Sequence, residues 1–170
     1  MLTNMPPTKT LLVMRHAKSS WKTNEPDKRR PLSGRGTRDA VVAGQFIAPL
    51  TVDMVWCSSA TRTQQTWQCA RMGGAAAGEV RVSDELYGAS GDELLEQLRE
   101  TPASAATVLL IGHEPGVSEL VGLLAVHSEL RDAAEAHFPT SGLAVLGLAG
   151  DWDELTPGSA SMVAFEIPRG

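Results

Sequence analysis

The stretch TLLVMRHAKSS, from Thr10 to Ser20, begins as an apolar run and stops abruptly at an arginine, a histidine and a lysine. Four consecutive apolar residues, Leu11 to Met14, are typical of a strand that is buried on both faces of a mostly parallel sheet. Arg15 and His16 then mark the carboxyl end of that strand, which is the edge where ligands bind in open α/β sheets. This cationic pair predicts an anion site, although each residue alone is more simply explained as a surface arginine or as an ordinary surface or core histidine.

The length and composition of the chain indicate a globular protein with one core. It has 170 residues, of which 42% are hydrophobic and 21% are charged, and it contains no low-complexity tract or repeat. We expect one domain over residues 1–170, with residues 1–9 as a flexible N-terminal extension. The net charge of −5 argues against nucleic acid as a partner, so any bound anion must be held by local basic groups.

Signals for targeting and for metal binding are weak in this sequence. The first residues, MLTNMPPTK, carry one lysine and precede an apolar run that is far too short for a signal peptide or a membrane span. We therefore predict a cytoplasmic protein with no membrane association. Cys57 and Cys69 lack the spacing of a zinc site, so we expect two buried thiols and no metal.

Hydrophobic patterns after the first strand alternate between those of helices and those of strands. A core-facing helix is expected after RRPLSGRG, with Val42, Phe46, Ile47 and Leu50 on its apolar side. Further helices are expected after an N-cap at Ser58 or Ser59, after the capping box that begins at Ser90, over 117–124 and over 127–137. Strands are expected over 53–57, 79–82, 107–111, 143–148 and 162–167. This alternation predicts an α/β fold, a three-layer sandwich around a mostly parallel sheet with room for an antiparallel edge strand.

Three loops at strand ends have a similar chemical character. MRHAKSS follows the first strand, CSSATRT follows the second, and IGHEPG follows the strand over 107–111. They supply Arg15, His16, Arg62 and His113. Two arginines and two histidines around one pocket are able to bind a phosphoryl group and to neutralise the charge on its oxygens during transfer. The combination predicts a phosphoryl site more strongly than any one of these residues does.

At these residues the sequence resembles the histidine phosphatase superfamily, a family with a phosphoglycerate-mutase-like fold. Arg15-His16-Ala17 matches the RHG motif of the family, Arg62 in SSATRT matches its second arginine, and His113 in GHEP matches its second histidine. RPLSGRG and FPTSG, the latter from Phe138 to Gly142, resemble the short SixA-type members of the first branch. Ala17 replaces the glycine of the motif, which is acceptable where its φ is negative.

The resemblance implies a role for each matching residue. His16 is the expected nucleophile, and it forms a phosphohistidine intermediate that water then hydrolyses. Arg15 and Arg62 are expected to clamp the phosphoryl oxygens, and His113 to donate a hydrogen bond to them. Lys18 and Ser19 are candidate contacts at the rim. Larger relatives carry a general acid in a longer connection, for which the short SDELYGAS region offers Glu85 and, second, Asp84.

The expected activity is that of a metal-independent phosphatase without a cofactor. Phosphohistidine in proteins is the expected substrate, and a histidine-phosphotransfer domain is one form that the partner protein could take. A small phosphorylated metabolite is the alternative substrate, which would make the chain a phosphomonoesterase. A phosphate-recognition module without catalytic activity is the alternative from another functional class.

Overall fold

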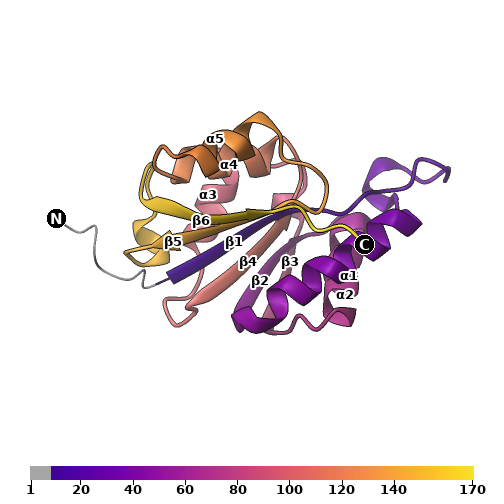
Figure 1. Cartoon of the computed structure of the whole chain (residues 1–170), viewed down its shortest axis with the longest axis horizontal. Coiled ribbons are helices and arrows are strands. Elements are labelled where there is room, and N and C mark those ends of the chain that lie inside the picture. The colour runs from indigo at the N-terminus through magenta and orange to yellow at the C-terminus, as the bar shows by residue number, and fades with distance from the viewer. Residues whose placement is uncertain (1–8) are drawn as a thin grey trace.

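Six strands form one sheet in the computed structural model of the chain, which describes residues 9–170 (Figure 1). Their order across the sheet is β3-β2-β4-β1-β5-β6. The strands are β1 (Lys9–Arg15), β2 (Val52–Ser58), β3 (Ala77–Ser83), β4 (Thr107–Gly112), β5 (Leu143–Leu148) and β6 (Ala160–Glu166). The N-terminal extension was predicted over residues 1–9. Residues 1–8 lie outside the described part of the chain, and Lys9 belongs to β1.

The central strand β1 is buried on both faces, as its unbroken apolar run predicts. Leu11 and Val13 belong to the core on one side of the sheet, and Leu12 and Met14 belong to the core on the other. This division follows from the two-residue repeat of a strand, which directs successive side chains to opposite faces. β4 shares this pattern over Val108 to Ile111.

Helices cover both faces of the sheet, so the predicted three-layer sandwich is confirmed (Figure 1). α1 (Gly34–Ile47) and α2 (Thr61–Met72) lie on one face, while α3 (Gly91–Arg99), α4 (Gly116–Leu124) and α5 (Glu129–Ala136) lie on the other. Short 3₁₀ turns η1 to η4 lie at Asp27–Arg29, Ala48–Leu50, Asp84–Leu86 and Trp152–Glu154. No helix among residues 9–170 has both the length and the apolar character that crossing a bilayer requires.

The sheet is mostly parallel, as expected, but its antiparallel strand does not lie at the edge. β1, β2, β3 and β4 pair in parallel, whereas β5 pairs antiparallel with both β1 and β6. The reversed strand is therefore the second one from the edge. Since β5 runs in the opposite direction, its first residue lies at the end of the sheet where β1 and β4 finish.

Two local predictions about helices differ from the structure. The buried side of α1 consists of glycines, alanines, Asp39 and Ile47, while Phe46 is exposed and Val42 and Leu50 are only half-buried. Small residues are needed there because α1 packs closely against α2; Gly44 lies so near the backbone of Ala70 that a Cβ would collide with it. The N-cap of α2 is Ala60, not a serine.

Two other local predictions are confirmed. Ser90 and Glu93 form the predicted capping box at the start of α3. Both cysteines are buried, and burial raises the pKa of the Cys57 thiol to about 12. The fold thus leaves neither thiol as a ready nucleophile.

Candidate active site

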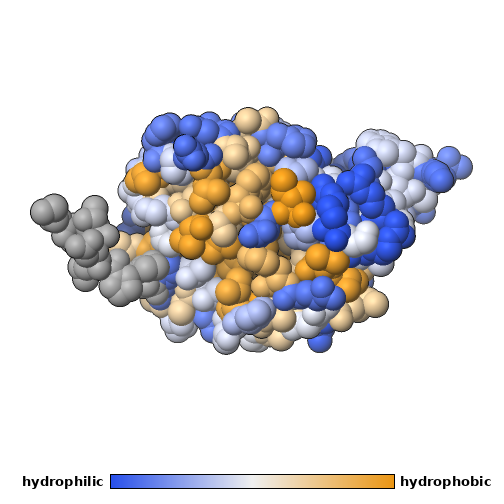
Figure 2. Space-filling model, viewed as in Figure 1, coloured by the Kyte–Doolittle hydropathy of each residue, from blue (hydrophilic) through white to orange (hydrophobic). Residues whose placement is uncertain are grey.

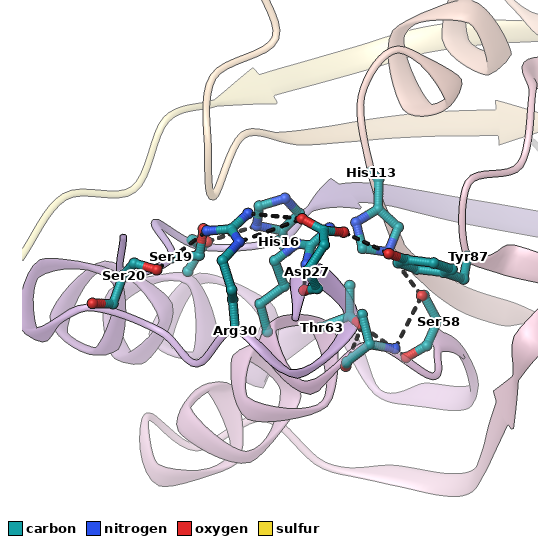
Figure 3. Close-up of polar contacts among 12 residues, drawn as sticks. His16, Ser19, Ser20, Asp27, Arg30, Ser58, Thr63, Tyr87 and His113 are labelled. Atoms are coloured by element: carbon teal, nitrogen blue, oxygen red, sulfur yellow. Dashed lines mark hydrogen bonds and ion pairs between the residues drawn. The ribbon is translucent and has the colours of Figure 1, made fainter. Parts of the chain in front are cut away.

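The carboxyl ends of β1, β2 and β4 lie side by side because these strands are neighbours and run parallel. The predicted loops after them therefore meet at one edge of the sheet, as Figure 3 shows for His16, Ser58 and His113. The His16 and His113 rings have centroids 5.2 Å apart. Backbone contacts hold them in place, since the His16 N–H donates to the Gly112 carbonyl at 3.0 Å.

The segment before β5 supports the same loop from its other side. The Arg15 N–H donates to the Gly142 carbonyl at 3.0 Å, and the Ser141 N–H donates to the His16 carbonyl at 3.1 Å. Ser141 has a φ of 64°, a strained value for a residue other than glycine, and its side chain is fully buried. The FPTSG stretch thus positions the candidate nucleophile.

Hydrogen bonding gives His16 the tautomer that a nucleophile requires. Its Nδ1 lies 2.7 Å from the carbonyl oxygen of Ala17. A carbonyl can only accept, so Nδ1 carries the proton and the Nε2 lone pair is left free to attack. Ala17 has no positive φ, as its replacement of glycine requires, and its N–H donates to Thr66 Oγ1 at 3.0 Å.

Both histidines are held neutral. Burial is the main reason that the pKa of His16 falls to about 3; the hydrogen bond to the Ala17 carbonyl opposes the fall, and the nearby His113, Arg62 and Arg15 act in the same direction as burial. Burial also lowers the pKa of His113 to about 4, with Arg62 as the next cause. Desolvation, more than the neighbouring positive charge, therefore keeps the imidazoles in the form that can attack or donate.

Ser58, which the sequence suggested only as a helix cap, orients His113. Its Oγ lies 2.8 Å from His113 Nε2 and also accepts the Ala60 N–H at 3.3 Å. Since the hydroxyl proton has no other acceptor among residues 9–170, it donates to Nε2, and the imidazole proton then lies on Nδ1. His113 Nδ1 is buried and has no hydrogen-bond partner in the described chain. This N–H is available for a ligand oxygen.

The two arginines present further donors. Arg15 Nη1 donates to the Phe138 carbonyl at 2.9 Å, and the side chain of Arg62 is only 8% exposed. Within the described chain, the Nε groups of both arginines are buried without a partner. Burial also lowers the pKa of Arg15, and so does the charge of Arg62, a sign that the two cations act on one another. Such buried guanidinium groups form a strong site for an oxyanion.

Asp27 and Tyr87 belong to the site although the sequence did not single them out. Tyr87 donates its hydroxyl to Asp27 Oδ2, and its ring contacts His113 edge-on with centroids 5.5 Å apart. Figure 3 shows Asp27 between His16 and Tyr87. The Tyr87 hydrogen bond is the main reason that the pKa of Asp27 falls to about 2, and the charge of Arg62 contributes to this fall. In the sequence, the feature that lies nearest to Asp27 is the RRPLSGRG stretch, which begins two residues later at Arg29.

The remaining predicted residues lie around the site in less direct positions. Ser19 is buried, and its Oγ accepts a hydrogen bond from Arg30 Nη1 at 2.6 Å. Lys18 is exposed, and its carbonyl accepts from the N–H of Ser33, the N-cap of α1. Neither side chain is held toward the two imidazoles by a hydrogen bond in residues 9–170.

Among residues 9–170, neither candidate acid forms a hydrogen bond or ion pair with His16 or His113. Glu85 is exposed and lines a surface depression together with acidic residues of α3, among them Glu93 and Glu96. Asp84 is exposed and pairs with Lys28 at 2.8 Å. The residue of the SDELYGAS region that reaches His113 is Tyr87.

One cluster among residues 9–170 has the ligand spacing of a metal site, and it lies far from the histidines. It consists of the exposed side chains of Asp151, Asp153 and Glu154. Asp151 pairs with Lys9 at the start of β1, whereas His16 follows the end of that strand. The histidine site itself offers guanidinium and imidazole donors, which suit a phosphoryl group more than a cation.

The sequence of the chain matches a known protein family and related proteins. Residues 11–98 match the family model described as histidine phosphatase superfamily (branch 1). An uncharacterized protein of Mycobacterium tuberculosis is 42% identical over 163 residues, which cover 92% of this chain and all of that protein.

Two solved structures share both fold and sequence with the chain. One, assigned as the phosphohistidine phosphatase SixA of Nakamurella multipartitia, has a TM-score of 0.86 and 34% identity, and the match covers 96% of this chain and 99% of that one. The other, assigned as SixA of Agrobacterium tumefaciens, has a TM-score of 0.78 and 26% identity and covers 97% of this chain and all of that one.

Proposed function

Because the chain belongs to branch 1 of the histidine phosphatase superfamily, we propose that it removes phosphoryl groups from phosphohistidine in proteins. The observation that carries this proposal is the buried, neutral His16, whose Nδ1 proton is held by the Ala17 carbonyl. The likeness to two structures assigned as SixA supports the choice of phosphohistidine over other phosphorylated groups.

The reaction proceeds in two displacements at phosphorus. His16 Nε2 attacks in line, so the Nε2–P bond forms as the bond from phosphorus to the substrate nitrogen breaks, and that nitrogen takes the electron pair. Water then attacks the phosphohistidine intermediate. The new O–P bond forms, the bond to Nε2 breaks, and inorganic phosphate and a proton leave.

Arginine and imidazole donors stabilise both displacements. Arg15 and Arg62 hold the equatorial oxygens through charge-assisted hydrogen bonds, and the Nδ1–H of His113 donates another. These groups supply the charge compensation that a metal supplies in other phosphatases, so we propose that neither a metal nor a cofactor takes part.

The leaving group explains why a strong general acid is not needed. An imidazole that already carries a proton on its far nitrogen leaves as a neutral molecule, whereas an alkoxide needs a proton at the moment of cleavage. The exposed position of Glu85 agrees with this chemistry. Phosphohistidine in a protein is therefore the substrate we propose.

Rapid quench of the full chain with a ³²P-labelled phosphohistidine protein tests the proposal. We expect an acid-labile, alkali-stable phosphoenzyme that is absent in His16→Ala, with turnover unchanged by a chelator. A label that persists in His16→Ala would refute the nucleophile. Phosphate binding without turnover in the wild type would indicate a recognition module, and efficient turnover of alkyl phosphates alone would indicate a small-molecule phosphatase.

A further inference from the structure

Positive charge is concentrated in one part of an acidic chain. Eight of the fifteen Lys and Arg residues lie between Arg15 and Arg38, where the only acids are Glu25 and Asp27, although the whole chain has a net charge of −5. Most of this stretch is the connection between β1 and α1. Figure 1 shows that connection projecting from one end of the molecule, and Figure 2 shows hydrophilic side chains over the same end.

An aromatic side chain is displayed on the same connection. Trp21 is 73% exposed, and the guanidinium carbon of Arg30 lies 3.6 Å from the centroid of its ring. Arg30 itself is buried and donates to Ser19 Oγ at 2.6 Å and to the Asp27 carboxylate at 3.3 Å. The exposed indole therefore stacks on Arg30, whose guanidinium is held by hydrogen bonds to Ser19 and to Asp27 of the candidate active site.

Three exposed cations accompany Trp21. Lys18, Lys22 and Arg35 line the same surface depression as the indole, and we call these four side chains the basic face. Lys18 lies two residues after His16, so the basic face borders the proposed phosphoryl site. A rigid aromatic group with surrounding charges is typical of a protein-binding surface, where tryptophan supplies contact area and charges guide encounter.

We propose that the basic face is the docking surface for an acidic protein segment that carries the phosphohistidine. This inference rests on the proposed function and names the kind of partner on which it acts. A small phosphorylated metabolite would be held by Arg15, Arg62 and His113 and would not require charges beyond them. An acidic partner is attracted to this face and repelled by the rest of the chain, which favours a productive orientation.

Synthetic peptides with one central phosphohistidine test the docking surface. Three versions have glutamate, alanine or lysine on both sides, and free phosphoimidazole serves as the substrate without a docking segment. With the full-length chain at low salt, we expect kcat/KM for the glutamate peptide to exceed that for the lysine peptide by about tenfold or more. Added salt should reduce this ratio toward one, because exposed charges are screened within about 10 Å at 0.1 M.

Variants separate the basic face from general charge effects. Lys22→Glu and Trp21→Ala should each lower the ratio of glutamate-peptide to phosphoimidazole kcat/KM by about threefold or more. Arg71→Glu is the matched control for Lys22→Glu, because Arg71 is exposed near the end of α2 and both substitutions change the net charge by the same amount. It should leave that ratio unchanged.

The outcomes distinguish the docking surface from the proposed function. Wild-type turnover of all three peptides at one rate would overturn the docking surface and leave the phosphatase intact. Failure of the wild type on every peptide and on phosphoimidazole would instead refute the phosphatase. Sedimentation with vesicles of phosphatidylglycerol and phosphatidylcholine, lost in Trp21→Ala, would assign the basic face to a membrane and also overturn the proposal.

Discussion

Both terminal nitrogens of the Arg62 guanidinium donate to Asp27, Nη1 to the backbone carbonyl at 2.7 Å and Nη2 to Oδ2 at 3.2 Å. Asp27 thus accepts hydrogen bonds from the same guanidinium, that of Arg62, which is proposed to bind the phosphoryl oxygens. Its pKa of about 2 keeps it ionised near neutral pH, and its side chain is 53% exposed. An incoming oxyanion must share Arg62 with this negative charge.

Removing the charge of Asp27 should therefore strengthen oxyanion binding. We expect Asp27→Asn to lower the Kd of tungstate or inorganic phosphate by about tenfold, because a unit charge at this range and at an intermediate dielectric has at least that effect. Isothermal titration calorimetry measures it. Asp84→Asn, which removes an exposed carboxylate paired with Lys28, is the control. Weaker binding in Asp27→Asn would show that Asp27 mainly positions Arg62.

The fork of Arg62 should be essential for catalysis. Arg62→Lys keeps the charge but cannot form two parallel hydrogen bonds, so the transition state should lose roughly 2 to 4 kcal/mol and kcat/KM should fall about 30- to 1,000-fold. Thermal unfolding should remain cooperative. Arg71→Lys on the same helix is the control, and wild-type activity in Arg62→Lys would mean that Arg62 is only a buried structural residue.

Ser58 should act as a positioning residue through His113. Ser58→Ala removes the donor to Nε2, so we expect kcat to fall by roughly 10- to 100-fold, as for other groups that orient a functional histidine. Long-range ¹H–¹⁵N NMR should show the Nδ1–H tautomer of His113 in the wild type and a mixture in the variant. Ser59→Ala should change neither. A large loss of activity with the tautomer retained would contradict the assignment.

Stability should fall on moderate acidification because two neutral imidazoles are buried. The pKa values of His16 and His113 drop from 6.5 in the unfolded chain to about 3 and 4, so the unfolded chain binds more protons between these limits. The stability is present above about pH 6.5 and is lost as the pH falls, by roughly 1.4 kcal/mol per pH unit for each imidazole. Urea unfolding between pH 7 and 5 measures this slope of the free energy of unfolding against pH. His16→Asn should reduce the slope. His137→Gln, at an exposed position, is the control and should leave it unchanged.

Glu85 should contribute little to the hydrolysis of phosphohistidine. We expect Glu85→Gln to change kcat/KM on phosphohistidine by less than about tenfold, whereas a true general acid accounts for about 100-fold or more. Steady-state assays on phosphohistidine and on an alkyl phosphate make the comparison. Equal large losses on both substrates would identify Glu85 as the acid despite its exposed position.

The sequence was sufficient for the architecture because the signals for it are local. The apolar runs at Leu11 to Met14 and at Thr107 to Ile111 require strands buried on both faces, and strands separated by helices lead to a parallel arrangement. Parallel strands then bring Arg15, His16, Arg62 and His113 to one edge, which is why residues from three loops far apart in the chain could be predicted to meet.

Local patterns were less reliable where the packing partner decides the outcome. Phe46 has the spacing of a core residue but is exposed, because close contact between α1 and α2 selects small residues on the buried side. The acid predicted at Glu85 rested on its place in a connection, and a connection carries no periodicity that would show which of its side chains turns inward. In the structure it is Tyr87 that reaches His113.

The sequence by itself thus determined the strands, the layers and the strand ends that carry the candidate site, because hydrophobic periodicity depends on neighbours in the chain, whereas the order in which β2, β4 and β1 lie side by side was seen only in the structure. Only the tertiary structure decided the finer chemistry. The Ala17 carbonyl sets the tautomer of His16, Ser58 orients His113, and Asp27 occupies Arg62 from 35 residues away. Burial, which depends on the whole fold, lowers the pKa of both histidines, and no local pattern in a sequence encodes the depth at which a side chain finally lies.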